Sequence, residues 1–118
     1  MKRISFVLIL IVLNCCSSSP KVNFTVTNFS GHDIDSLIID NGFDILVLRD
    51  IGENEEIECV LSFSDKVFKA DGLHQVQAYG DDIELQKRFG YYSNGAPTVN
   101  QYLIKIYQDS ISTVSGFN

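Results

Sequence analysis

Short segments along the chain alternate between apolar and polar residues. In residues 21–28 (KVNFTVTN), Val22, Phe24 and Val26 are separated by single polar residues, which is the period of a strand buried on one face. Further segments rich in β-branched and aromatic residues lie at residues 34–40, 44–48, 74–79, 83–92, 100–108 and 110–115. Glycines interrupt the chain between these segments, and such frequent turn signals predict an all-β sandwich or barrel.

One of the turns carries a specific hairpin signal. Asn41-Gly42 lies between residues 34–40 and 44–48, and both residues tolerate a positive φ. We therefore expect these two segments to pair as antiparallel strands.

The segment at residues 55–68 fits two periods. Its apolar residues recur at helical spacing, and Asn54 could cap the start of such a helix. Ile57, Cys59 and Leu61 also alternate with polar residues. Because the neighbouring segments have the character of strands, we expect a strand here as well.

The first 20 residues have a different composition. Lys2 and Arg3 precede the apolar run of residues 4–13 (ISFVLILIVL), and two cysteines and three serines follow, which is the layout of a secretory signal. As a helix, the run would span about 15 Å, roughly half of the bilayer core, so it is too short for an ordinary membrane span. Cleavage by ordinary signal peptidase at the serines is one reading. The other is that the region resembles a bacterial lipobox, in which a cysteine receives a diacylglycerol group and becomes the new N-terminus.

We expect Cys16 to be the lipidated residue. Leu13 lies three residues before it, and Cys15 supplies a small residue directly before the cut. The alternative acceptor is Cys15, which would place Asn14 directly before the cut. The expected organisation is a lipoprotein signal peptide at residues 1–15, a polar tether at residues 16–21 and one domain at residues 22–118.

The net charge of the expected mature chain argues against nucleic acid and anionic lipid as partners. Cleavage before Cys16 would leave 7 of the 9 Lys and Arg residues against 15 Asp and Glu, a net charge of −8. Such an acidic domain has no electrostatic footprint for nucleic acid. Anionic lipid headgroups would also repel it, so we expect membrane attachment through N-terminal acyl chains alone. If the chain is cleaved before Cys16 and Cys16 is lipidated, Cys59 has no cysteine with which to form a disulfide. We also expect the domain to be monomeric.

Three stretches, "FTVTNFSG", "LRDIGENEEIECVLSF" and "FGYYSNGAP" followed by "YLIKIYQDSI", resemble small envelope lipoproteins of Bacteroidetes. The resemblance implies an immunoglobulin-like antiparallel β-sandwich of about seven or eight strands. Some lipoproteins of that phylum reach the cell surface through an acidic tag directly after the lipidated cysteine. Residues 17–21 (SSSPK) contain no acid, so the resemblance implies an outer-membrane lipoprotein that faces the periplasm.

Candidate chemistry is sparse. The acids around Asp33 and Asp44 do not match the spacing of a calcium loop, and we expect them to be solvated at strand edges. Cys59 shares an alternating face with Ile57 and Leu61, so we expect a buried, unreactive thiol. No phosphate loop, catalytic serine motif or metal-type cysteine and histidine spacing occurs. We therefore expect no enzymatic activity, no cofactor and no metal.

The stretch "YYSNGAP" contains the candidate partner-binding residues. Simple alternation through residues 83–92 places Tyr91 on the same face as Phe89, in the core, and turns Tyr92 outward. Asn94-Gly95 could close a tight turn beside Tyr92. An exposed tyrosine on a rigid turn can anchor a protein or stack on a sugar, so Tyr92 and Asn94 form the predicted contact site.

These observations favour a non-catalytic, lipid-anchored envelope protein that binds a protein or a glycan. Two other functions are compatible with the sequence. An immunity lipoprotein that neutralises a toxin would use its acidic surface against a basic active site. A small envelope hydrolase would need a catalytic group assembled only by folding.

Overall fold

The alternating segments form strands, and their order along the chain is that of an all-β domain. The computed structural model describes residues 21–63, 71–93 and 96–116. The strands in these ranges are β1 (Lys21–Asn28), β2 (Ile34–Asp40), β3 (Ile45–Ile51), β4 (Glu56–Ser62), β5 (Gly72–Gly80), β6 (Ile83–Ser93), β7 (Ala96–Pro97), β8 (Gln101–Ile106) and β9 (Ile111–Ser115). Within this part of the chain no helix is long and apolar enough to cross a membrane.

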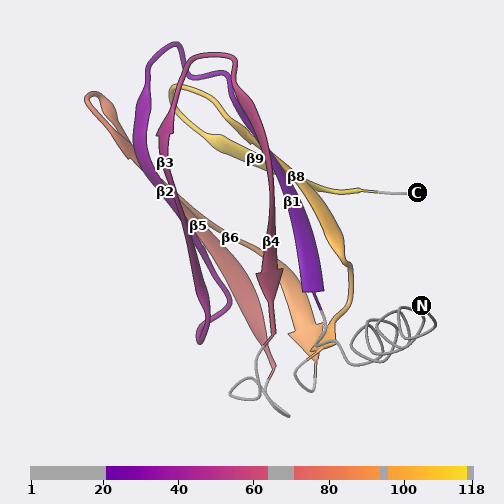
Figure 1. Ribbon diagram of the computed structural model, residues 1–118. Helices are drawn as coiled ribbons and strands as arrows, with labels where there is room; N and C mark the ends of the chain where they lie inside the picture. Colours follow the sequence, from indigo (N-terminus) through magenta and orange to yellow (C-terminus); the bar gives the residue numbers. More distant parts are fainter. Residues whose placement is uncertain (1–20, 64–70, 94–95, 117–118) are drawn as a thin grey trace, which may run out of the picture.

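The strands form two sheets that pack face to face (Figure 1). One sheet has the order β4-β1-β8-β9, and the other has the order β3-β2-β5-β6-β7. The pairing of β1 with β8 is parallel, whereas the other strand pairs are antiparallel. The chain crosses between the sheets after β1, after β3, after β4 and after β7, so each sheet combines segments that are distant in sequence.

The core lies between the two sheets and consists mainly of the apolar side chains that point inward from the strands. Val22, Phe24 and Val26 of β1 are all buried, as their alternation in the sequence predicts. The side chains that the two sheets bury against each other also include Leu37 and Ile39 from β2, Val76 and Ala78 from β5, and Ile104 and Ile106 from β8.

The expected all-β sandwich is therefore confirmed, and most strand positions agree with the sequence pattern. The bounds of β1 and β2 are those read from the sequence, and β4 shows that the strand reading was right for residues 56–62. The described residues contain nine strands rather than seven or eight, because Ala96–Pro97 adds a two-residue strand beside β6. The immunoglobulin-like assignment stays a prediction.

The β2–β3 hairpin forms as expected, but its turn is longer than the sequence suggested. Asn41 to Asp44 connect the two strands, and only Gly42 in this loop has a positive φ, of 98°. The buried Asn41 side chain accepts hydrogen bonds from the backbone N–H groups of Phe43 and Asp44, at 3.0 and 2.8 Å. The asparagine therefore shapes the loop through its side chain rather than through a left-handed backbone.

At the opposite end of the sandwich, Asn28 joins two loops. Its buried Nδ2 donates hydrogen bonds to the backbone oxygens of His32, Ile51 and Gly52, at 2.7, 3.1 and 3.1 Å. Its Oδ1 accepts from the backbone N–H and the hydroxyl of Ser30, at 3.0 and 2.6 Å. One side chain thus ties the β1–β2 connection to the end of β3 and the turn that follows it.

Replacing Asn28 by alanine should destabilise the domain by about 2 to 4 kcal/mol, because buried carbonyl groups would lose their donor. Urea unfolding of the variant measures this change. Asn23→Ala is the matched control: it lies on the same strand but is exposed, so its free energy of unfolding should change by less than about 0.5 kcal/mol. Equal stability of the two variants would show that the Asn28 network does not hold the loops together.

Candidate functional site

The structure describes some of the residues singled out from the sequence and not others. Cys15, Cys16 and Asn94 lie outside the described residues. Tyr91, Tyr92 and Cys59 lie within them, and the two tyrosines reverse the expectation. Tyr92 is 3% exposed and belongs to the core, whereas Tyr91 is 48% exposed. The prediction that Tyr92 points outward, and with it the assignment of Tyr92 as a surface contact, is wrong.

A β-bulge in β6 is the reason for the reversal. His74 of β5 pairs with Phe89, but Gly72 pairs with Tyr92. Leu73 therefore faces two residues, Gly90 and Tyr91, instead of one. Gly90 has a φ of 66°, as expected for a bulge with glycine in the left-handed region. The additional residue shifts the alternation by one position, so the side chain after Tyr91 points inward.

Tyr92 uses its inward position to hold the β2–β3 hairpin. Its hydroxyl donates a hydrogen bond to the backbone oxygen of Asn41 inside the domain. Burial raises the pKa of the Tyr92 hydroxyl, and the charges of Asp40 and Asp71 raise it further. A Cβ atom at Gly72 would clash with the tyrosine ring, which explains the glycine at the start of β5.

His74 lies beside Tyr92 in a cluster of aromatic rings. It is fully buried, and its ring centroid lies 5.4 to 5.9 Å from five others, those of Phe24, Phe63, Phe89, Tyr92 and Tyr102. Neither ring nitrogen has a hydrogen-bond partner of good geometry among the described residues. Burial lowers the pKa of the imidazole, while the Phe89 backbone and the charge of Asp40 act in the opposite direction. The neutral form of His74 is therefore the one that the core accommodates.

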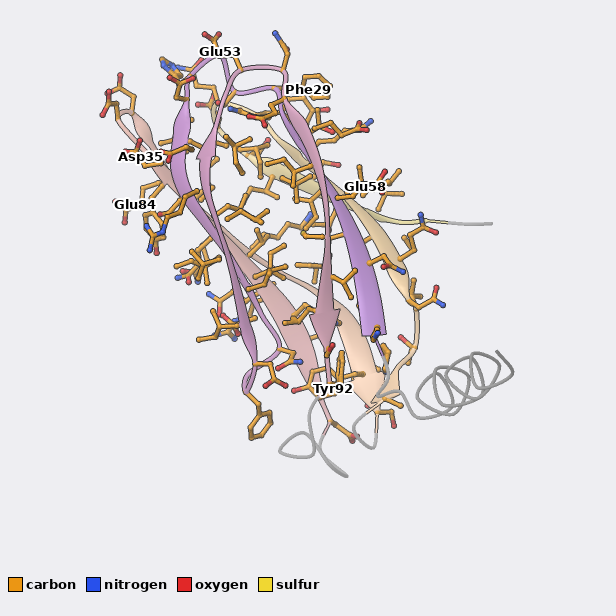
Figure 2. The ribbon with its side chains drawn as sticks, viewed as in Figure 1. Phe29, Asp35, Glu53, Glu58, Glu84 and Tyr92 are labelled. Carbon is orange, nitrogen blue, oxygen red and sulfur yellow. The ribbon has the colours of Figure 1, made fainter. Side chains whose placement is uncertain are left out.

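Exposed apolar side chains gather on the outer face of the five-stranded sheet, toward the β2–β3 turn. The described residues include nine large exposed hydrophobic side chains, and five of them belong to this region. We call this group the hairpin surface; its members are Phe43, Ile45, Val47, Leu73 and Tyr91. Figure 2 places Tyr92, which lies beneath it, at the end of the sandwich opposite Phe29 and Glu53.

A hollow of about 320 Å³ adjoins the hairpin surface at Leu73. Strand register places Asp40 of β2, Gln75 of β5 and Arg88 of β6 side by side across the sheet. These three residues line the hollow together with Gly42 of the β2–β3 turn and with Gly72, Leu73 and His74 of β5. The hollow thus offers one acid, one amide and one guanidinium beside the apolar side chain of Leu73.

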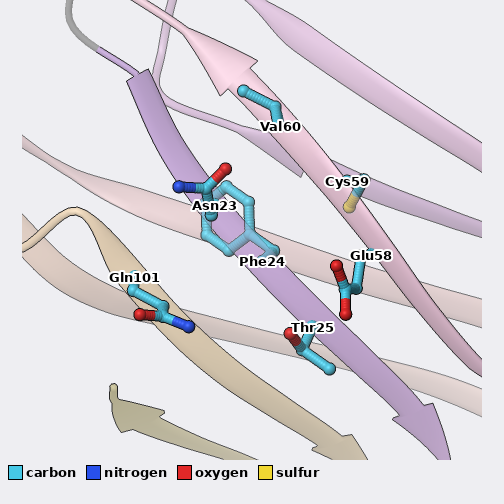
Figure 3. Close-up of a pocket in the computed structure, with 7 residues that line it drawn as sticks. All are labelled: Asn23, Phe24, Thr25, Glu58, Cys59, Val60 and Gln101. Atoms are coloured by element: carbon cyan, nitrogen blue, oxygen red, sulfur yellow. The ribbon is translucent and has the colours of Figure 1, made fainter. Parts of the chain in front are cut away.

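A second hollow, of about 390 Å³, lies on the other sheet (Figure 3). Its outward side chains are amide, hydroxyl and carboxylate groups from β1, β4 and β8, together with Val60. Cys59 also borders it; the thiol is half-buried rather than fully buried, and burial raises its pKa to about 11. A thiol with this pKa is a poor nucleophile at neutral pH.

The acidic residues do not assemble into a metal site in the described part of the chain, where no three histidine, cysteine, aspartate or glutamate side chains are grouped to hold an ion. Asp33, Asp35 and Asp50 border a smaller hollow of about 190 Å³.

The residues that the sequence pattern did not single out are Tyr91, Leu73 on the neighbouring strand β5, and Ile45 and Val47 on β3. One signal pointed to Tyr91. An isolated glycine inside a strand pattern, here Gly90, is typical of a bulge, and a bulge at that position exchanges the faces of Tyr91 and Tyr92.

Comparison with known proteins supports the fold and gives no information on function. No protein-family profile matches the chain, and no characterised protein sequence matches it. The chain is similar to a solved structure, the "NMR structure of the protein from Eubacterium rectale", with a TM-score of 0.55 and 9% identity. The match covers 83% of this chain and 90% of the other. At this identity the likeness concerns the fold alone.

The aromatic cluster generates a pH-dependent prediction. The folded state lowers the pKa of His74, so the unfolded chain binds a proton more readily. The stabilising contribution of neutral His74 is present above the unfolded pKa of about 6.5 and is lost as the pH falls below it. The free energy of unfolding should decrease from pH 7.5 to 5.5, with a slope of at most about 1.4 kcal/mol per pH unit from this residue.

The His74→Phe variant should remove most of this slope, because phenylalanine carries no proton to exchange. His32→Gln, which replaces the other histidine of the chain, is the control and should retain the slope. Urea unfolding at a series of pH values measures both variants. A slope that persists in His74→Phe would assign the pH dependence to other groups.

Proposed function

We propose that this protein is a lipid-anchored, non-catalytic binding module of the cell envelope, and that it docks a partner protein through the hairpin surface. The observation that carries the proposal is the concentration of exposed apolar side chains at Ile45, Leu73 and Tyr91 and their neighbours. Exposed apolar patches with a polar rim are typical of protein interaction sites.

The chemistry of the patch favours a protein over a glycan. Three of its five side chains, those of Ile45, Val47 and Leu73, are aliphatic, and these three offer neither a flat ring nor hydrogen bonds to sugar hydroxyl groups. Tyr91 can serve as an aromatic anchor at the centre of a protein interface. Asp40 and Arg88 in the hollow supply polar groups that can select a partner.

The anchor belongs to the same proposal. Lipidation of Cys16 would hold the chain on the membrane, with the outer membrane and the periplasm as the expected location. Five residues from Ser17 to Lys21 span at most about 18 Å. β1 begins at Lys21, at the end of the sandwich where the β2–β3 turn lies (Figure 1). The hairpin surface would then face a partner close to the membrane.

A comparison of Tyr91→Ala with Tyr107→Ala tests the docking surface. Tyr107 is 40% exposed and follows β8 near the opposite end of the domain, so it is a matched control. Full-length bait proteins are cross-linked in intact cells, and captured proteins are quantified by mass spectrometry. Tyr91→Ala should lose at least one partner that Tyr107→Ala retains, while thermal unfolding shows that both variants fold.

Identical capture by both variants would contradict the hairpin surface as the docking site. Mass spectrometry of the N-terminal peptide from the same preparations reads the anchor. Lipid on Cys16 supports the proposal, lipid on Cys15 moves the site by one residue, and an unmodified N-terminus at Ser17 or later removes the anchor.

A further inference from the structure

Strand β3 forms one edge of the five-stranded sheet. It pairs with β2 on one side, and among the described residues no strand pairs with its other side. An edge of this kind presents backbone N–H and C=O groups to another chain. Which residues present them can be read from the hairpin.

The β2–β3 turn fixes the hydrogen-bonding pattern. The backbone N–H of Asn41 donates to the oxygen of Asp44 at 3.2 Å, so these two residues form a hydrogen-bonded pair. In an antiparallel ladder such pairs alternate with pairs that are not bonded to each other. The register continues without a shift to Ile34 and Ile51. The backbone groups of Ile45, Val47 and Arg49 therefore point away from β2, toward the open edge.

The side chains at this edge are apolar on both faces. Ile45 and Val47 are 65% and 43% exposed on the outer face, while Leu46 and Leu48 are partly buried against the core. Of the three other edges among the described residues, two carry protective features. β4 presents the exposed glutamates Glu56 and Glu58, and β7 is two residues long and contains proline. β3 lacks such features over four residues, between Asp44 and Arg49.

The charges that flank the edge argue against a second copy of the chain as the occupant. Antiparallel self-pairing centred on Val47 would place Asp44 of each copy opposite Asp50 of the other. Centring on Leu46 would instead place Asp44 opposite Leu48, and centring on Leu48 would place Asp50 opposite Leu46. Each register that keeps the faces aligned therefore places like charges together or an acid against leucine.

We propose that β3 binds an extended segment of a partner protein as an additional antiparallel strand, and that this segment has alternating apolar residues with lysine or arginine at both ends. The apolar residues of the segment would continue the row formed by Ile45 and Val47. Its basic ends would lie beside Asp44 and Asp50. Strand addition of this kind takes its affinity from backbone hydrogen bonds and its specificity from alternate side chains. The inference rests on the proposed function and names the partner of the hairpin surface.

A nine-residue peptide with alternating valine and threonine, two lysines at each end and blocked termini is the probe. Binding to the full-length protein is measured by isothermal titration calorimetry. Val47→Pro removes the backbone N–H that points to the open edge. It keeps all the hydrogen bonds between β3 and β2, because the Val47 N–H does not bond to β2, and proline is tolerated at edge strands. It should weaken binding by about tenfold or more, whereas Val47→Thr, which keeps the backbone donor, should stay within about threefold.

Two matched peptides test the chemistry without changing the protein. The same sequence with its five central amides N-methylated should not bind, because it cannot form the strand ladder. The same sequence with glutamate in place of lysine should bind at least about tenfold more weakly. The N-methylated peptide decides the question if Val47→Pro fails to fold.

Undiminished binding by a folded Val47→Pro variant, or by the N-methylated peptide, would overturn the proposal. Equal binding of the glutamate peptide would overturn the assignment of a basic segment. A concentration-dependent dimer in analytical ultracentrifugation that Val47→Pro abolishes would replace the partner with a second copy. Peptide binding that depends on Val47, combined with unchanged capture by Tyr91→Ala, would retain strand addition and reject the wider hairpin surface.

Discussion

The arrangement of this domain depends on one additional residue in β6. Gly90 has a backbone φ in the left-handed region, and Leu73 on the neighbouring strand β5 faces both Gly90 and Tyr91. Only glycine fits this position without strain, because of its φ and because a Cβ atom there would clash with the Tyr102 ring. The bulge exchanges the faces of the two residues that follow, so Tyr91 points outward and Tyr92 points inward.

Both consequences of the bulge meet at the β2–β3 hairpin. From inside, the Tyr92 hydroxyl bonds the backbone of Asn41, whose side chain in turn holds the loop. On the outer face, Tyr91 and Leu73 are exposed and belong, with Ile45, to the hairpin surface. The same irregularity therefore fixes the position of the hairpin and completes the surface beside it. His74 lies beside Tyr92 in the core, and burial lowers the pKa of its imidazole.

The sequence predicted the fold better than the site. Period-two alternation was sufficient to locate β1 to the residue, because that strand pairs on both sides without a register shift. The bounds of β2 followed instead from its β-branched composition and the Asn41-Gly42 turn, since its pairing with β5 shifts register between Ile34 and Ser36. The same rule failed at Tyr91 and Tyr92, because an alternation pattern assumes one residue per step and a bulge adds one. The short strand β7 and the parallel pairing of β1 with β8 were also beyond the pattern. Pairing partners depend on contacts between distant segments, and local periodicity does not record these contacts.

Exposure of the two adjacent tyrosines is the most direct test of the bulge. Native protein is treated briefly with tetranitromethane, which nitrates accessible tyrosine rings, and fragmentation mass spectrometry locates the nitro group on the peptide that contains both residues. The structure predicts nitration of Tyr91, at 48% exposure, and protection of Tyr92, at 3%. Tyr92 should react only after unfolding in urea. Nitration of Tyr92 in the native protein, with Tyr91 protected, would show a regular β6 strand and would contradict this account.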